Sequence, residues 1–152
     1  MELSKDLLEF IHLLNEKKVD YVVIGGWAVA LHGKPRYTKD IDILIKQDPE
    51  NAAKVISVLH DFGFGSLGLS SDDFLRPDHI IQLGVEPNRI DLLTSLSGVS
   101  FDEASKERVV TSIQGESVPV IGLDALLKNK RIAGRDQDLV DARYLEKLSE
   151  KK

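Results

Sequence analysis

The sequence predicts an α/β fold in which a mixed, twisted sheet of about five strands has helices packed mainly on one face. Short apolar runs of strand length alternate with helical stripes through residues 3–62, which is typical of strand–helix–strand units. A hairpin pattern and two further helical stripes follow toward the C-terminus. With 152 residues, 42% of them apolar, the chain is expected to form one domain over residues 1–152.

The composition excludes several classes of function. The chain has no cysteine, so neither a disulfide framework nor a thiolate metal site can form. A net charge of −5 argues against strong non-specific binding of nucleic acid, which needs a surplus of Lys and Arg. No run approaches the roughly 18 apolar residues of a membrane span, and the N-terminus lacks a signal-peptide pattern. We therefore expect a cytoplasmic protein without a membrane partner.

The N-terminal part of the chain predicts helix, strand and helix in turn. Residues 3–18 carry an apolar stripe at helical spacing, formed by Leu3, Leu7, Ile11 and Leu14. Residues 19–24 are an unbroken apolar run, the pattern of a buried strand. Residues 26–32 then predict a short helix. His32 is expected to end this helix and to have a structural role.

A second strand and helix follow. Residues 40–46 alternate acidic and apolar side chains, as a half-buried strand does. Asp48 and Pro49 are typical of a helix start, as the N-cap and the first helical residue. The apolar stripe that follows predicts a helix over residues 49–62.

The C-terminal half predicts strands first and helices last. Residues 65–77 are compatible with a weak edge strand, a loop or one helical turn. The remaining segments are predicted as strands 80–85 and 89–93, a helical turn 101–106, and a hairpin of strands 109–114 and 117–121. Two helices complete the chain, separated by a break near Gly134.

The acids of the second strand are the first functional signal. Asp40 and Asp42 are two residues apart, so in a strand they point to the same face, about 6.6 Å apart. Dense negative charge on a half-buried strand requires a cation, and carboxylate oxygens suit Mg²⁺. A solvated strand end with incidental acids is the alternative.

Two glycines precede these acids at the start of the short helix. Gly25 and Gly26 let the backbone approach a ligand closely, and their amides lie at a helix N-terminus, where anions are favoured. We therefore predict that both bind phosphate. A tight strand-to-helix turn without a ligand is the alternative.

Together these residues carry a resemblance. A Gly-Gly pair that opens a helix, followed by Asp40-Ile-Asp42-Ile, is similar to the signature of the nucleotidyltransferase superfamily typified by DNA polymerase β. The match covers roughly residues 19–93 and implies the nucleotidyltransferase fold. The chain departs from the commonest form at Gly26, where many members have a serine whose hydroxyl also contacts phosphate.

The resemblance implies a two-metal site. Asp40 and Asp42 would hold two Mg²⁺ ions, or Mn²⁺, and Asp91 on a neighbouring strand would complete the site and act on the attacking hydroxyl. A salt bridge from Asp91 to Arg89 or Arg36 is the alternative. Arg36, Thr38 and Lys39 precede the acids, and Arg36 is the best candidate to bind phosphate.

The basic run at residues 128–138 resembles the tail of several small bacterial nucleotidyltransferases. In those proteins a helical lysine reaches toward the nucleotide and an Arg–Asp pair holds the helix. The resemblance assigns the first role to Lys128 and the pair to Arg135 and Asp138. An ordinary solvated helix face is the alternative.

The resulting hypothesis is a minimal nucleotidyltransferase that transfers a nucleoside monophosphate from an NTP such as ATP to an acceptor hydroxyl. The sequence leaves the acceptor open among protein, tRNA and a small molecule, and it allows a protein partner or a homodimer. The other hypothesis is a non-catalytic or regulatory module of a two-component pair, of the toxin–antitoxin type, that works by association.

Overall fold

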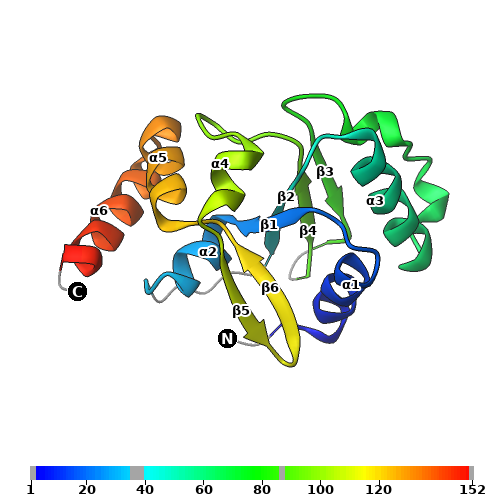
Figure 1. Cartoon of the computed structure of the whole chain (residues 1–152), viewed down its shortest axis with the longest axis horizontal. Coiled ribbons are helices and arrows are strands. Elements are labelled where there is room, and N and C mark those ends of the chain that lie inside the picture. Colours follow the sequence, from blue (N-terminus) through cyan, green and yellow to red (C-terminus); the bar gives the residue numbers. More distant parts are fainter. Residues whose placement is uncertain (1–2, 35–39, 86–87, 151–152) are drawn as a thin grey trace.

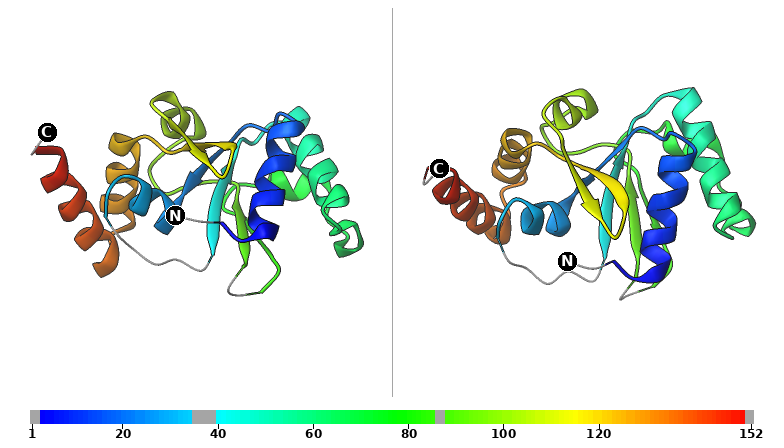
Figure 2. Two further views of the ribbon diagram at one scale, coloured as in Figure 1. Left: turned by 90° about the horizontal axis from the view of Figure 1, so that it is seen from below. Right: turned by 60° about the horizontal axis from the view of Figure 1, so that its bottom comes forward.

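The structure is a computed structural model that describes residues 3–34, 40–85 and 88–150. It has helices on both sides of a central sheet (Figures 1 and 2). In chain order the elements are α1 (Lys5–Glu16), β1 (Tyr21–Ile24), α2 (Gly25–Leu31), β2 (Ile41–Ile45), α3 (Pro49–Asp61), the 3₁₀ turns η1 (Gly65–Leu67) and η2 (Ser71–Phe74), β3 (Ile80–Leu83), β4 (Ile90–Leu93), α4 (Phe101–Lys106), β5 (Val109–Ile113), β6 (Glu116–Val120), α5 (Leu123–Ala133) and α6 (Asp136–Glu150).

The sheet is mixed, with the strand order β3-β4-β2-β1-β6-β5. The central pair β1–β2 is antiparallel, whereas β2–β4 and β1–β6 are parallel. The described sheet has six strands, one more than expected, because both strands of the C-terminal hairpin join it. β6 is added to β1 through the single register pair Val23–Val120, a long-range contact that periodicity cannot predict.

The predicted elements agree with the structure to within a few residues at their ends. Asp48 is the N-cap of α3, its carboxylate accepts a hydrogen bond from the Glu50 amide, and Pro49 is the first helical residue. The ambiguous segment 65–77 forms the turns η1 and η2, and no strand is present there. Its Gly and Ser residues favour local turn hydrogen bonds over ladder pairing.

The helices lie in two groups. α1 and α3 pack together on one side of the sheet, while α5 and α6 lie on the opposite side (Figure 2). The Phe10 ring of α1 meets the Phe62 ring after α3 edge-on, with 5.2 Å between centroids. None of the described helices has the length and apolar character needed to span a membrane.

A buried asparagine joins the ends of β1, β2 and α3. Asn51 is 1% exposed, and its Oδ1 accepts a hydrogen bond from the Asp20 amide at 2.7 Å. Its Nδ2 donates to the carbonyl oxygens of Asp20 at 3.0 Å and Lys46 at 2.9 Å. All three backbone groups lie where strands end. The Asp20 carbonyl also accepts from the Lys46 amide at 3.2 Å, so Asn51 adds to the backbone pairing at these ends.

Replacing Asn51 with alanine would remove its hydrogen bonds to the Asp20 amide and the Lys46 carbonyl, and one of the two that the Asp20 carbonyl accepts. We expect Asn51→Ala to lower the free energy of unfolding by roughly 2–4 kcal/mol, measured by urea denaturation. Glu50→Gln, at the neighbouring exposed position, is the control and should change stability little. Equal stability of both variants would contradict this role.

Candidate active site

The two strands that carry the acids are parallel neighbours in register. Asp42 on β2 is paired directly with Asp91 on β4, and adjacent strands lie about 4.8 Å apart. The same cross-strand row continues to Ile24 on β1 and to Gln82 on β3. Side chains of one row share a face of the sheet, so two carboxylates distant in sequence lie side by side.

Asp40 is the residue directly before β2 and lies near Asp42 and Asp91. Its Oδ1 accepts a hydrogen bond from the Arg89 amide at 3.2 Å, and the Ile41 amide donates to the Arg89 carbonyl at 3.1 Å. These contacts hold the start of β2 against the start of β4. Asp40, Asp42 and Asp91 are therefore neighbours, as the sequence predicts for the acids of one site.

The Arg89 guanidinium bridges two of the three acids. Its Nε and Nη2 donate to the two carboxylate oxygens of Asp91 at 2.9 and 3.1 Å. Its Nη2 is also 3.3 Å from Oδ2 of Asp40. The alternative predicted for Asp91, an ion pair with Arg89, is thus present. Within the described residues, no three Asp, Glu or His side chains are arranged as metal ligands.

Of the three acids, Asp42 has the least nearby positive charge to offset its own negative charge. Its pKa is raised to about 7, chiefly by burial and then by the neighbouring carboxylates of Asp91 and Asp40, while Arg89 acts in the opposite direction. Among the described residues, one guanidinium thus contacts two carboxylates of a group of three. The donor set fits a hard divalent cation, because carboxylate oxygens are its preferred ligands and added positive charge would let Asp42 ionise.

The absence of a side chain at Gly25 leaves space for the Asp42 carboxylate. The φ of Gly25 is +66°, and a Cβ built there would lie 2.2 Å from Oδ2 of Asp42. Any side chain at position 25 would therefore collide with the carboxylate, besides adopting a left-handed conformation. The Asp42 carboxylate therefore explains why position 25 is a glycine. Phosphate binding by Gly25 and Gly26 stays a prediction.

A pocket of about 580 Å³ opens above the acidic row. Its floor is one face of the sheet and includes Ile24, Asp42, Asp91, Leu93, Ile80 and Gln82. One wall is polar and is formed by Asp78, His79 and the loop from Ser95 to Ser97. The other wall comes from the end of α5 and the turn before α6, with Lys130 and Arg135.

The structure gives Lys128 a different position from the predicted one. Its amino group is 2.9 Å from Oε2 of Glu103, and it lines a separate cavity beside Gly122. Lys130 reaches the acidic pocket instead. Lys130 belongs to the buried stripe of α5 with Leu126 and Leu127, so helical periodicity was the signal that could have separated it from Lys128.

Of the other predicted residues, the structure places His32 but not Arg36. Arg36 lies outside the described residues, as do Thr38 and Lys39. His32 is the residue at which α2 ends, and its Nε2 is 2.7 Å from the Ile121 carbonyl oxygen. Its role is structural, as expected.

The family model described as aminoglycoside-2''-adenylyltransferase matches residues 6–145, which is nearly the whole chain. The chain belongs to the aminoglycoside-2''-adenylyltransferase family. The resemblance to the nucleotidyltransferase superfamily typified by DNA polymerase β is thereby confirmed at the level of the family. No curated protein sequence matches this chain.

Solved structures share the fold of this adenylyltransferase family member. The Thermotoga maritima protein TM1012, assigned as a nucleotidyltransferase, has 19% identity and a TM-score of 0.58, covering 96% of this chain and 91% of its own. The lincosamide antibiotic adenylyltransferase LnuA, solved lincomycin-bound, has 21% identity and a TM-score of 0.54, with 95% and 97% covered. ANT(2'')-Ia, solved with adenylyl-2''-tobramycin, has 13% identity and a TM-score of 0.54, with 91% and 84% covered.

The steric role of Gly25 can be measured against a matched glycine. Gly68 has a similar φ of +70° but nothing within 4 Å of an added Cβ. We expect Gly68→Ala to cost about 1–2 kcal/mol of stability from backbone strain alone, and Gly25→Ala to cost clearly more. Urea denaturation provides both values.

A double-mutant cycle identifies the colliding group. In an Asp42→Ala background the cost of Gly25→Ala should fall most of the way to that of Gly68→Ala, because the carboxylate is gone and only the Cβ of residue 42, at 3.1 Å, remains close. An unchanged cost would mean that Gly25 is needed for another reason.

The raised pKa of Asp42 predicts a pH-dependent stability in the absence of metal. Between about pH 4 and 7 the folded protein keeps a proton that the unfolded chain releases, so stability falls as the pH rises through this window. Asp42→Asn removes this loss and should be more stable than the wild type above pH 7, by up to about 4 kcal/mol. Denaturation with EDTA at pH 4, 5.5 and 8 tests this, and parallel curves for the two proteins would contradict it.

Proposed function

We propose that this protein transfers a nucleoside monophosphate, with AMP favoured by the family, from an NTP to an acceptor hydroxyl. The observation that carries the proposal is the in-register pair of Asp42 and Asp91 on the floor of the pocket, with Asp40 beside it and cationic side chains on the facing wall. Adenylyl transfer needs this combination, because it develops negative charge on phosphate oxygens in a site where the nucleophile must lose a proton.

The reaction exchanges one phosphorus–oxygen bond for another. The acceptor oxygen bonds to the α-phosphorus, and the bond from this phosphorus to the bridging oxygen breaks and releases pyrophosphate. The hydroxyl proton passes to a carboxylate, for which we propose Asp91. Arg89 holds both oxygens of Asp91, so it orients this carboxylate on the pocket floor.

Divalent metal ions belong to this proposal. Asp40, Asp42 and Asp91 would hold Mg²⁺ or Mn²⁺, and bound ions would make the hydroxyl more acidic and neutralise charge on the leaving group. The raised pKa of Asp42 supports this, because bound positive charge would favour the ionised form of all three acids at neutral pH. Gly25 lines the same pocket, within reach of a phosphate held there.

The acceptor we propose is a hydroxylated small molecule. The structural neighbours solved with lincomycin or adenylyl-2''-tobramycin act in a fold that this chain shares. A volume of about 580 Å³ suits small ligands, since such sites are typically about 300–1,000 Å³. The polar wall of Asp78, His79 and Ser95 offers hydrogen-bonding groups and one carboxylate, which suits an acceptor carrying hydroxyl and amino groups.

The proposal is tested by metal-dependent nucleotide binding and by transfer. We expect calorimetry to detect Mg²⁺-dependent ATP binding by the wild type, and binding at least about tenfold weaker in Asp42→Asn. Asp61→Asn is the control, because Asp61 at the end of α3 pairs with Lys17 outside the pocket. Equal binding by wild type and Asp42→Asn would overturn the assigned role.

Transfer is read with α-labelled ATP and a panel of aminoglycosides and lincosamides. Label appearing on a small molecule with the wild type, and at least about 100-fold more slowly with Asp91→Asn, supports the proposal. Nucleotide binding without label on any acceptor would instead support the association module.

A further inference from the structure

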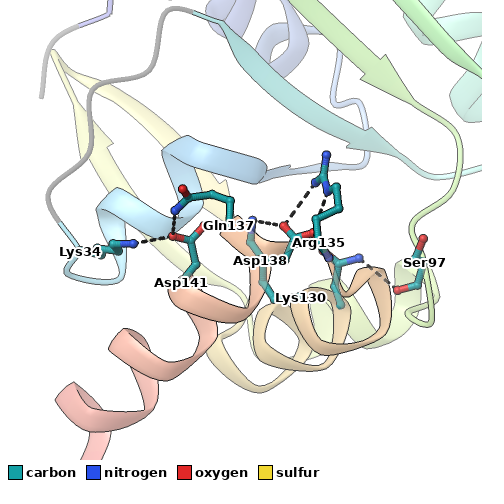
Figure 3. Close-up of polar contacts among 8 residues, drawn as sticks. Lys34, Ser97, Lys130, Arg135, Gln137, Asp138 and Asp141 are labelled. Atoms are coloured by element: carbon teal, nitrogen blue, oxygen red, sulfur yellow. Dashed lines mark hydrogen bonds and ion pairs between the residues drawn. The ribbon is translucent and has the colours of Figure 1, made fainter.

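A network of five charged side chains lies behind the pocket wall that faces the acids, and Lys130 and Arg135 of this network line the pocket (Figure 3). The buried carboxylate of Asp141, 0% exposed, accepts from Lys34 Nζ at 2.6 Å and has Lys130 Nζ 3.4 Å away. Asp138, 2% exposed, accepts from Lys130 Nζ at 3.1 Å and from Arg135. Among the described residues, this network contains three cations, Lys34, Lys130 and Arg135, and two carboxylates.

Arg135 is the member of this network that reaches the pocket with an exposed head group. Its side chain is 79% exposed and lines the pocket, and Figure 3 shows it extending away from the helix while Lys34 and Asp141 lie further along. Its Nε and Nη2 donate to Asp138 at 2.7 and 3.3 Å. Among the described residues, Nη1 has no hydrogen-bond partner.

Asp138 holds this guanidinium in one orientation. Burial opposes the ionisation of Asp138, but hydrogen bonds from Arg135 and Lys130 outweigh it and lower its pKa. The Asp138 carboxylate is therefore charged at neutral pH and is itself fixed by the buried Lys130. A two-point contact to a fixed carboxylate leaves Arg135 little rotational freedom, which is how a guanidinium fork is preorganised for a second anion.

The pocket consequently has opposite charge on facing sides. The carboxylates of Asp42 and Asp91 line the floor, whereas the cationic side chains of Lys130 and Arg135 line the facing wall. The two sides influence each other, since Asp42 contributes to the raised pKa of Arg135, after the larger effects of Asp138. A ligand that suits both sides binds metal ions at the acidic floor and presents anionic groups to the cationic wall, as a nucleoside triphosphate does.

We propose that Arg135 is a ligand-binding residue that holds the pyrophosphate portion of the nucleotide, and that Asp138 is its positioning residue. The identity of the ligand rests on the proposed function. The inference adds to that function the pyrophosphate-binding role of Arg135 and the positioning role of Asp138. The alternative is that the Arg135–Asp138 pair only stabilises the start of α6, as an i, i+3 ion pair on a helix does.

The test uses inorganic pyrophosphate with Mg²⁺ and the whole chain, read by calorimetry without nucleotide or acceptor. We expect Arg135→Gln to weaken pyrophosphate binding about tenfold or more, and Arg135→Lys to retain part of the affinity because the charge remains but the fork is lost. Arg131→Gln is the matched control, because Arg131 lies in the last turn of α5, pairs with Glu146 and does not line the pocket.

Asp138→Asn separates positioning from simple charge. Removing a negative charge beside Arg135 would strengthen anion binding if only charge mattered, whereas loss of positioning weakens it. We expect weaker binding, by about threefold to tenfold, in a variant whose circular dichroism matches the wild type. Asp138 is buried, so its substitution can destabilise the fold. Arg135 is exposed, so Arg135→Gln tests the proposal without that effect.

The outcomes distinguish this inference from the proposed function. Wild-type affinity in Arg135→Gln, or no pyrophosphate binding by the wild type, would overturn the role of Arg135 and leave adenylyl transfer to be judged by its own label assay. Equal weakening in Arg131→Gln would also overturn it, since only general charge would then matter. Selective weakening in Arg135→Gln and Asp138→Asn supports it, whatever the acceptor is.

Discussion

The register between β2 and β4 is the constraint on which the rest of the site depends. It places Asp42 and Asp91 side by side on one face of the sheet, where like charges repel and burial penalises ionisation. Such an arrangement persists only if nearby groups compensate it. The surrounding features, a bridging guanidinium, a glycine and a facing cationic wall, can each be understood as a response to this pair of carboxylates.

Compensation comes from two directions. Arg89 lies two residues before Asp91 on the same chain segment and neutralises Asp91 and Asp40 directly. The wall of α5 and α6 acts across the pocket, through a network whose own carboxylates are buried and paired. Neither fully neutralises Asp42. The residual imbalance makes the pocket a suitable environment for a ligand that brings both cations and phosphate oxygens.

The fold also explains why the C-terminal helices belong to the site. α5 and α6 lie on the side of the sheet opposite α1 and α3 (Figure 2), so they border the open face that carries the acids. Asp141 of α6 binds Lys34, which directly precedes the segment leading back to Asp40. This ion pair therefore connects α6 to the part of the chain that precedes Asp40.

Much of this could be predicted from the sequence, because the relevant patterns are local. Alternation along residues 40–46, the Asp48–Pro49 helix start and the glycine pair follow from backbone geometry and propensity alone. The family resemblance added Asp91 as a partner for Asp40 and Asp42. The contact between β1 and β6 and the second contact of Arg89, with Asp40, depend on long-range packing, so local patterns could not decide them. Helical periodicity separates Lys130 from Lys128, but the contacts of Lys130 with Asp138 and Asp141 do not follow from it. The sequence by itself determined which residues carry charge and which element each lies on, because these are properties of a short stretch of chain. Only the tertiary structure decided which charges face one another, since strand register and helix rotation are set by burial of apolar surface across the whole molecule.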